Sequence, residues 1–445
     1  MPIPVIAIFD IGKTNKKLFL FDEEYTIVFE KSAHLTETVD DDGDPCENLE
    51  SLQQWIIQSF REVNSLAAFR IMAINFSAYG ASFVHLDIDG NPVAPLYNYT
   101  KPFPEDLKNK FYATYGGVKT FSRISASPAL GHLNSGMQLY WLKYKKPVLF
   151  EKIKVSLHLP QFISFLFTGQ CNTDITSIGC HTNLWNFQEN KYHQWVDEEG
   201  IKSKLAPVEP SDCVRPCKNY PSLLAGIGLH DSSAALIPYL SCFPEPFILL
   251  STGTWCISLN PFNNLPLTDA ELSHDCLCYL TYKGDPVKAS RLFTGFEHEQ
   301  QVKKLAEHFH RDKDYYKNIV FDPKLVEQNV KVPFCENSLG EYESYEVAYT
   351  LFIKSLVKRQ VTSINLVLQN TAVKRIFVDG GFSKNPIFMH LLSEALPSIE
   401  VYAASLAQAT ALGAALAIHH HWNKKMFQKN VIDLRYFPAT GISSI

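Results

Sequence analysis

The sequence lacks several features that would have classified it at once. No stretch of about 18 uninterrupted apolar residues occurs, so we expect no membrane span and no membrane partner. The apolar run from Pro2 to Phe9 follows no basic segment and ends at Asp10, which predicts a buried strand rather than a signal peptide. Basic residues are not in excess: the formal net charge of −5 argues against a dedicated nucleic-acid-binding protein.

Cysteines at metal-binding spacing are also missing. The ten cysteines form only two close pairs, Cys213 with Cys217 and Cys276 with Cys278, and neither has a second Cys or His pair at zinc-finger spacing. This usage is typical of reduced, mostly buried thiols, and we expect a cytoplasmic protein.

Two common nucleotide-binding motifs are absent as well. Gly12-Lys13-Thr14 has the ending of a P-loop, but Ala7 stands where that motif needs its first glycine. The chain has no G-x-G-x-x-G loop and no Asp-Phe-Gly, which argues against a protein kinase.

The composition that is present suits a large globular protein. Hydrophobic residues make up 46% of the 445 residues and charged residues 20%, which argues against global disorder and predicts two or three domains. A cluster of prolines at 238, 244 and 246 marks the best boundary. We therefore predict an N-terminal domain over 1–241 and a C-terminal domain over 242–445.

Both halves open with the same pattern of an apolar strand, a small glycine-containing turn and a second apolar strand. The first copy has its turn at Gly12 and the second at Gly253. Apolar runs predict further strands at 26–30, 70–76, 83–87, 375–378 and 400–402. Helical periodicity predicts helices at 47–66, 345–369, 386–396 and 406–419 and a mainly helical region at 129–205. The pattern indicates an α/β protein whose two halves share one fold.

The turn at Gly12 has two interpretations from its residues alone. It is either a phosphate-binding hairpin, in which backbone N–H groups, Thr14, Asn15 and a lysine surround phosphates, or a plain β-turn with two solvated lysines. The segment Phe377 to Pro386, with Gly380 and Gly381 after a carboxylate, also allows a nucleotide to approach the backbone closely.

The middle segment around His230-Asp231 also has two interpretations. A Gly-rich apolar run precedes this pair, and a Ser- and Ala-rich segment that starts a predicted helix follows it. The small residues of that segment would let another molecule approach. The carboxylate of Asp231 is either a general base for a hydroxyl nucleophile or the N-cap of an ordinary helix.

Five segments, in order along nearly the whole chain, resemble the FGGY family of carbohydrate kinases in the actin-like ATPase superfamily. They are Asp10-x-Gly12-x-Thr14, His230-Asp231-Ser232, Ser251-Thr252-Gly253-Thr254-Trp255, Gly380-Gly381-Phe382-Ser383-Lys384-Asn385 and Gln408-Ala409-Thr410-Ala411-Leu412-Gly413. The resemblance implies two ribonuclease-H-like domains with a cleft between them, ATP in the cleft and the sugar deep in the first domain. It looks closest to the rhamnulose and fuculose kinases.

The resemblance also implies roles for individual residues. Asp231 would be the catalytic base and Asp10 would hold Mg²⁺. The implied ATP-binding residues are Gly12, Lys13, Thr14, Asn15, Lys16, Thr252, Gly253, Thr254, Gly380, Gly381, Phe382, Ser383 and Asn385. The implied sugar-binding residues are His230, Tyr79, Gly80, Ser82 and Tyr99.

The sugar loops depart from the pattern of rhamnulose kinases. Ser82 stands where those kinases have an aspartate, and Tyr97 to Lys101 replace an Asp and an Arg. Loss of a carboxylate removes a hydroxyl acceptor, whereas Tyr79 and Tyr99 add apolar faces. These changes favour a 6-deoxy-ketohexose such as rhamnulose or fuculose, and a ketopentose is the other substrate we consider.

Two other hypotheses were weighed against an active sugar kinase. One is an ATPase of the same fold without sugar chemistry, which has no need for the His230-Asp231 segment. The other is a catalytically inactive regulatory relative that binds sugar and ATP; the presence of both Asp10 and Asp231 argues against it. We expect a small sugar as partner and no nucleic acid, and we leave a homodimer open.

Overall fold

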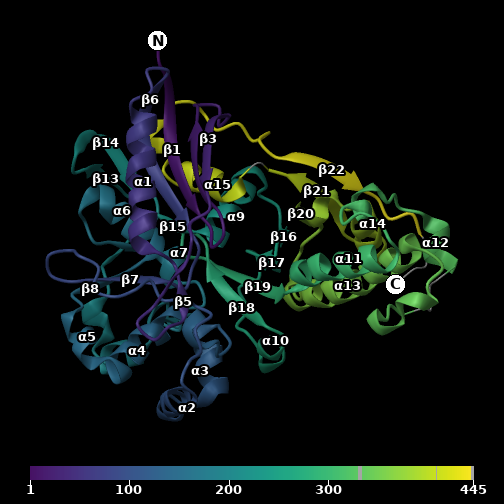
Figure 1. Ribbon diagram of the computed structural model, residues 1–445, viewed down its shortest axis with the longest axis horizontal. Helices are drawn as coiled ribbons and strands as arrows, with labels where there is room; N and C mark the ends of the chain where they lie inside the picture. Colours follow the sequence, from purple (N-terminus) through teal and green to yellow (C-terminus); the bar gives the residue numbers. More distant parts are fainter. Residues whose placement is uncertain (329–332, 407, 442–445) are drawn as a thin grey trace.

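The computed structural model describes residues 1–328, 333–406 and 408–441. It contains two large mixed sheets, one from each half of the chain, flanked by helices (Figure 1). The α/β class with two similar halves is therefore confirmed.

The first sheet has the strand order β13-β14-β6-β1-β2-β3, with β15 pairing to β6. Strand β1 is antiparallel to β2 and parallel to β6, so the predicted hairpin at Gly12 is confirmed. The bounds are β1 (Ile3–Ile11), β2 (Lys16–Phe21), β3 (Ile27–Ala33), β6 (Phe69–Ala78), β13 (Val214–Cys217), β14 (Tyr220–Gly226) and β15 (Leu229–His230).

The second sheet repeats this arrangement. Strand β16 is antiparallel to β17 and parallel to β20, as β1 is to β2 and β6. Its order is β18-β19-β17-β16-β20-β21-β22. The bounds are β16 (Phe247–Thr252), β17 (Cys256–Asn260), β18 (Cys276–Leu280), β19 (Pro286–Leu292), β20 (Arg375–Gly380), β21 (Glu400–Ser405) and β22 (Asp433–Phe437).

Helices make up much of the remaining described chain. The helices of the first half are α1 (Leu49–Asn64), α2 (Glu105–Thr114), α3 (Gly117–Ser125), α4 (Ser135–Lys145), α5 (Pro147–Lys152), α6 (Leu159–Thr168), α7 (Ile175–Ile178), α8 (Gln194–Glu198) and α9 (Asp231–Cys242). Those of the second half are α10 (Asp269–Ser273), α11 (Thr294–His308), α12 (Pro323–Gln328), α13 (Tyr345–Leu368), α14 (Pro386–Ala395), α15 (Ala409–Ala417) and α16 (His419–Trp422). Short strands β4 (Thr38–Val39), β5 (Pro45–Cys46), β7 (Phe83–Leu86), β8 (Val155–His158), β9 (Thr173–Asp174), β10 (Trp185–Asn186), β11 (Lys191–Tyr192) and β12 (Val208–Glu209) form small pairs beside them.

The predicted helix 406–419 is wrong in its extent. Helix α15 ends at Ala417, and α16 follows as a separate short helix. Ala407, inside the predicted range, lies outside the described residues.

Strand β1 is apolar throughout because both of its faces are covered. Val5, Ala7 and Phe9 pack into a core with α1 and α6. Ile6 and Ile8 point to the opposite face and pack against residues of α9 and α15. A strand covered on both sides reads as a continuous apolar run, which is the pattern at the start of this sequence.

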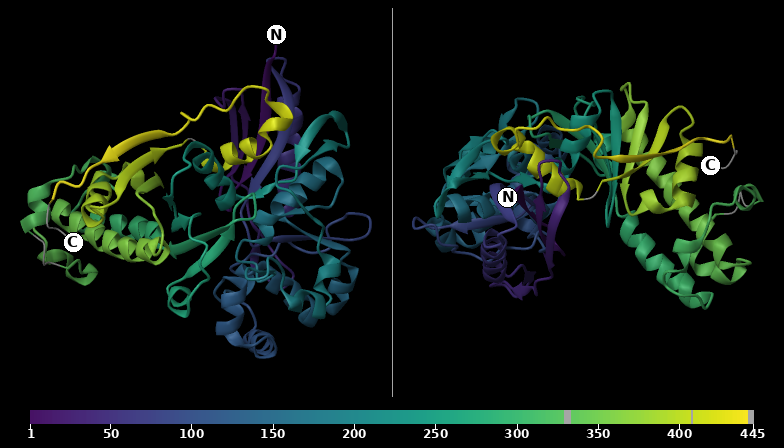
Figure 2. Two further views of the ribbon diagram at one scale, coloured as in Figure 1. Left: turned by 180° about the vertical axis from the view of Figure 1, so that it is seen from behind. Right: turned by 90° about the horizontal axis from the view of Figure 1, so that it is seen from above.

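Helix α15 comes late in the chain but packs on the first sheet. Ala411, Leu412 and Ala414 share a core with Ile6 and Ile8. Figure 2 shows this yellow segment beside the purple N-terminal strands, after which the chain returns to β22 at the edge of the second sheet.

Helix α9 lies between the two sheets. Its residues Ala234 and Ile237 pack with the core of the first sheet. Leu236 and Tyr239 pack instead with Phe247 and other residues of the second sheet. The residue that begins this helix is Asp231, so the fold places that carboxylate where the two halves meet.

Candidate active site

A cleft of about 1020 Å³ opens between the two halves. Asp10, the hairpin at Gly12 and Asp231 line it from the first half, and Thr254 and Trp255 line it from the second. Gln408 also lines the cleft, so these residues come from four segments that are far apart in the sequence.

The Gly12 hairpin presents its backbone and its polar tip to this cleft. Gly12 N–H donates a 2.9 Å hydrogen bond to Asn15 O, which closes the turn. Lys13, Thr14 and Asn15 line the cleft wall, with Thr14 and Asn15 exposed. The geometry suits the phosphate-binding interpretation, which stays a prediction.

Lys16 does not face the cleft, although we predicted it to bind ATP. Its side chain is 1% exposed and its ammonium lies 2.9 Å from Glu47 Oε1. The same ammonium donates to the Lys13 and Gly12 carbonyl oxygens at 2.9 and 3.2 Å. Lys16 thus supports the hairpin from behind, and its neighbour Lys17 lines the cleft instead.

Asp231 opens into the cleft from the first turn of α9. Strand β15 pairs with β6 immediately before it, so the edge of the sheet fixes its position. The N-cap of α9 is His230 rather than Asp231, which corrects the N-cap interpretation. The Asp231 carboxylate accepts a 2.6 Å hydrogen bond from Ser232 N–H, and about 30% of its side chain remains exposed toward the cleft.

Burial perturbs the acid–base chemistry of both cleft carboxyl groups. It raises the pKa of Asp231 to about 6, against the opposing effect of the hydrogen bonds from Ser232. Burial also raises the pKa of Asp10 to about 6; the nearby charge of Asp231 adds to this, and a hydrogen bond from Thr410 opposes it. Thr410 Oγ1 donates to Asp10 Oδ2 at 2.6 Å. Carboxyl groups shifted in this way, facing one cleft, are typical of a functional site.

The predicted sugar-binding residues divide into two groups. Tyr79 and Tyr99 line the cleft with their rings 6.2 Å apart. Ser82 is 2% exposed, and Ser82, Gly80 and His230 do not line the cleft, so a contact between these three residues and a sugar stays a prediction. A Cβ on Gly80 would lie 2.9 Å from the His230 ring, which explains why a glycine stands there.

Other residues of this wall were not predicted from the sequence. Phe103 and His132 line it, and the two ring nitrogens of His132 are buried without a hydrogen-bond partner in the described part of the chain. Trp255 and Phe293 face them from the second half, with their rings 4.6 Å apart. Only Trp255 lay in a segment that the sequence analysis quoted.

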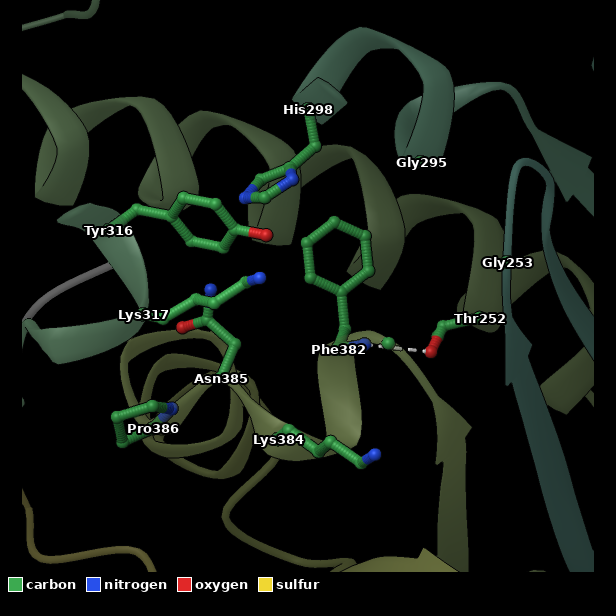
Figure 3. Close-up of a pocket in the computed structure, with 11 residues that line it drawn as sticks. Thr252, Gly253, Gly295, His298, Tyr316, Lys317, Phe382, Lys384, Asn385 and Pro386 are labelled. Carbon is green, nitrogen blue, oxygen red and sulfur yellow. Dashed lines mark hydrogen bonds between the residues drawn. The ribbon is translucent and has the colours of Figure 1, made fainter. Parts of the chain in front are cut away.

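A second pocket of about 560 Å³ lies in the second half, next to the cleft. Figure 3 shows the rings of His298, Tyr316 and Phe382 gathered around one space. The predicted residues Thr252, Gly253, Gly381, Phe382 and Asn385 line it. Lys384 and Pro386 of the segment Phe377 to Pro386 also line it. The remaining lining residues, Gly295, His298, Tyr316 and Lys317, were indicated by no local motif.

Close backbone contacts build this pocket. Thr252 Oγ1 accepts a 3.0 Å hydrogen bond from Phe382 N–H, drawn as a dashed line in Figure 3. A Cβ on Gly380, whose φ is +90°, would lie 2.0 Å from Thr252 O, and one on Gly295 would lie 1.7 Å from Gly253 O. Gly380 and Ser383 thus belong to the turn behind the pocket rather than to its wall. Thr254 lines the cleft and Gly253 lines the pocket, so the two spaces adjoin at this turn.

Two similar sheets around one cleft, with a pocket and carboxylates meeting there, define a protein of the actin-like ATPase fold. The chain belongs to the FGGY family of carbohydrate kinases. Residues 5–220 match the N-terminal domain of that family, and residues 244–426 match the domain described as "Carbohydrate kinase FGGY, C-terminal domain".

Known proteins are similar to this chain at low identity. A rhamnulokinase of Oceanobacillus iheyensis is 20% identical over 83% of this chain and 82% of its own length. One from Mannheimia succiniciproducens is 22% identical over 58% of this chain, which spans about half (54%) of that relative. The crystal structure of a carbohydrate kinase from Novosphingobium aromaticivorans is 20% identical, with a TM-score of 0.78 over 98% of this chain and 97% of that one. At this identity the structural likeness shows the fold alone.

No helix in the described ranges combines the length and the apolar character that crossing a bilayer requires.

Proposed function

We propose that this protein transfers the γ-phosphate of ATP to a hydroxyl group of a ketose, with Asp231 as the general base. Membership of a carbohydrate kinase family supports the reaction class. The observation that carries the proposal is the position of Asp231, whose carboxylate opens into a cleft that adjoins a second pocket in the opposite half.

Asp231 suits the role of base in both position and basicity. A pKa of about 6 leaves the carboxylate mostly ionised at neutral pH, yet makes it a better proton acceptor than an ordinary aspartate. Its free oxygen would accept the proton of the sugar hydroxyl as that oxygen attacks the γ-phosphate. His230, whose pKa burial lowers to about 3, is neutral and lies 3.2 Å from Asp231 Oδ1.

The second pocket suits the adenosine, and the turn at Gly253 leads from it to the cleft. Phe382 and Tyr316 offer ring faces for a base. The phosphates would then run between the turn at Thr252–Thr254 and the hairpin at Gly12, where backbone N–H groups and Lys13 meet them. Such a transfer depends on alignment and charge neutralisation, and closure of the two halves would exclude water.

The residues around Asp10 fit a magnesium ion. Mg²⁺ prefers oxygen ligands, and Asp10 places a carboxylate in the cleft near a second one, Asp231, whose charge raises its pKa. A cation there would relieve that repulsion. When bound, Mg²⁺ neutralises charge on the β- and γ-phosphates. Asp10 would hold the ion, and Thr410 would orient the Asp10 carboxylate through its hydrogen bond.

The walls of the cleft favour a sugar with an apolar end. Tyr79, Tyr99 and Phe103 present ring faces. Lys101 also lines the cleft, but its ammonium pairs with Asp40, Asp42 and Asp44 at 2.6 to 3.0 Å and so is engaged elsewhere. A methyl terminus would bury against the rings without leaving a hydroxyl unpaired, so we propose a 6-deoxy-ketohexose ahead of a ketopentose.

A coupled assay of ADP release tests the proposal. The panel would hold rhamnulose, fuculose, xylulose, ribulose, their parent aldoses and glycerol, each with Mg-ATP. We expect one deoxyketose to exceed the others in kcat/KM, and comparable turnover of xylulose and rhamnulose would contradict the preference. If no sugar in the panel is phosphorylated and ATP binding is shown separately, the result would instead support the hypothesis of a catalytically inactive regulatory relative.

A further inference from the structure

Three side chains of types that bind metals lie together beside Asp231. The ligand atoms of Cys180, His181 and His230 all lie within 4.8 Å of one another. The three residues are 0%, 6% and 3% exposed, respectively, so the cluster is buried. None of the roles described above uses Cys180 or His181.

The local fold forces these groups together. Cys180 and His181 follow directly after α7, and His181 has a φ of +40°. His230 comes from the end of β15, and Gly80 lies between the two segments. A Cβ on Gly80 would lie 3.0 Å from both Cys180 Sγ and His230 Nε2, so the glycine allows sulfur and imidazole to approach one another.

A hydrogen bond from one ring nitrogen orients the His181 ring. His181 Nδ1 lies 3.0 Å from Leu133 O, and since a carbonyl oxygen only accepts, Nδ1 carries the proton. The Nε2 of His181 therefore has a free lone pair. A backbone carbonyl on the outer nitrogen is the usual partner of a metal-bound histidine.

The His230 ring has a similar outer partner. Its Nδ1 lies 3.4 Å from Ser233 Oγ, and that hydroxyl donates its own hydrogen to Leu280 O at 2.9 Å. If Nδ1 carries the proton and donates it to Ser233 Oγ, the Nε2 of His230, 3.2 Å from Asp231 Oδ1, has a free lone pair. A cation bound at that nitrogen would lie close to the Asp231 carboxylate, whose negative charge would stabilise it.

We propose that Cys180, His181 and His230 form a binding site for a thiophilic divalent cation of the zinc type, and that its occupation inhibits the kinase. One sulfur and two imidazole nitrogens match the ligands that Zn²⁺ takes, with Asp231 or water as the fourth. Zinc bonds of about 2.0–2.3 Å put ligand atoms roughly 3.3–3.8 Å apart, so side-chain shifts of about 1 Å would close the site. On binding, the Cys180 thiol releases its proton to solvent and the thiolate bonds the metal.

The inhibitory part rests on the proposed role of Asp231 as base. A dication that takes an Asp231 carboxylate oxygen as its fourth ligand occupies a group that would otherwise accept the sugar hydroxyl proton. This site differs in chemistry from the one at Asp10, where the oxygen ligands suit Mg²⁺.

Cobalt(II) provides a binding test that needs no activity. The full chain, stripped of metal with a chelator, would be titrated with Co²⁺ while its absorption spectrum is followed. We expect a thiolate-to-cobalt charge-transfer band that saturates at one ion per chain and disappears in Cys180→Ser. Cys217→Ser is the matched control, because Cys217 is also buried and the band should persist in it. The exposed His420 and His421 cannot produce a thiolate band.

A second variant tests the site independently, in case Cys180→Ser does not fold. His181→Gln keeps the thiol and a group able to reach Leu133 O, and we expect Co²⁺ affinity to fall by about tenfold or more. Kinase assays with added Zn²⁺ then test inhibition. We expect inhibition that a chelator reverses, with a higher inhibition constant in Cys180→Ser than in Cys217→Ser, whatever the basal rate of either.

The outcomes separate this site from the proposed function. Absence of the charge-transfer band at excess Co²⁺, or its persistence in Cys180→Ser, would overturn the site while leaving any measured sugar phosphorylation intact. A band lost in Cys180→Ser, in a protein that phosphorylates no sugar, would support the site and count against the proposed function. Binding without any change in rate would overturn the inhibitory role.

Discussion

Gly413 of helix α15 packs directly on the main chain of Ala234 in helix α9. A Cβ on Gly413 would lie 1.8 Å from the Ala234 carbonyl oxygen, so the two helices meet at a distance that only glycine allows. Asn75 reinforces the contact, because its side-chain amide donates to Ala414 O at 2.7 Å. This contact fixes the helix that carries Asp231 against the segment that carries Thr410.

Replacing Gly413 with valine should therefore damage both stability and activity. The added side chain must push α15 away from α9, and overpacking of this kind costs roughly 1–3 kcal/mol or more. Urea unfolding would measure the loss of stability. Gly340→Ala is the control, since a Cβ there meets nothing within 4 Å. Equal stability of Gly413→Val and the parent would contradict the packing described here.

Asp231→Asn should remove the base while leaving the fold intact. Asparagine keeps the size of the side chain and an oxygen that accepts from Ser232 N–H. We expect kcat to fall by about 10²- to 10⁴-fold, the usual contribution of a positioned base, with ADP affinity nearly unchanged. Calorimetric ADP binding and steady-state kinetics would be compared with Asp197→Asn, a surface control. A kcat equal to the parent's would refute the assignment of Asp231.

Activity should depend on pH in one direction. Asp231 must be ionised to accept a proton, so kcat/KM for the sugar should rise as pH increases through about 6 and then level off. Asp10 has a similar pKa, so the midpoint belongs to the coupled pair rather than to one residue. A pH series of kcat/KM at saturating ATP measures it. Activity that stays flat down to about pH 4, the range of an ordinary aspartate, would contradict the raised pKa.

Gly381→Val should weaken ATP binding without unfolding the protein. Gly381 lines the second pocket, and the nearest atom to its added Cβ is Thr252 O at 3.8 Å, so a valine fits the protein but projects into the pocket. We expect KM for ATP to rise by about tenfold or more, with little change in Tm. An unchanged KM for ATP would mean that the nucleotide does not approach Gly381.

Lys16 and Lys13 should respond differently to the same substitution. Lys16→Met leaves Glu47 buried without its cation, and breaking a buried pair costs about 3–5 kcal/mol, so Tm should fall. The double variant Lys16→Met/Glu47→Gln should recover much of that loss. Lys13→Met, at a partly exposed position on the cleft wall, should leave Tm nearly unchanged and raise KM for ATP. The reverse pattern would place Lys16 at the phosphates after all.

Much of the framework was predictable because apolar runs and glycine turns are local signals. The hairpin at Gly12 and its counterpart at Gly253 could be read from strand, turn and strand. Lys16 and Lys17 show the limit of such reasoning. Successive side chains of a strand point to opposite faces, so only one of the two can face the cleft, and the sequence does not say which.

Long-range packing accounts for the other errors. The small residues after Asp231 were interpreted as room for a ligand, whereas the structure fills the space at Ala234 with helix α15. His298 and Tyr316 come from segments without a motif and reach the second pocket only through the packing of α11 and the turn at 315–318. The clustering of Cys180 with His230 could not be predicted from the sequence either. About fifty positions separate the two residues, and neither has a partner at the spacing of a known metal-binding motif.

The position of α15 has a consequence for how the chain matures on the ribosome. The face of β1 that carries Ile6 and Ile8 is covered by residues of α9 and by Ala411 to Ala415, and the latter are translated about 400 positions after β1. Until α15 is made, only α9 can cover this face, which leaves part of its apolar surface open to aggregation during synthesis. The core of the first sheet is therefore complete only after strands β16 to β21 of the second sheet have been translated.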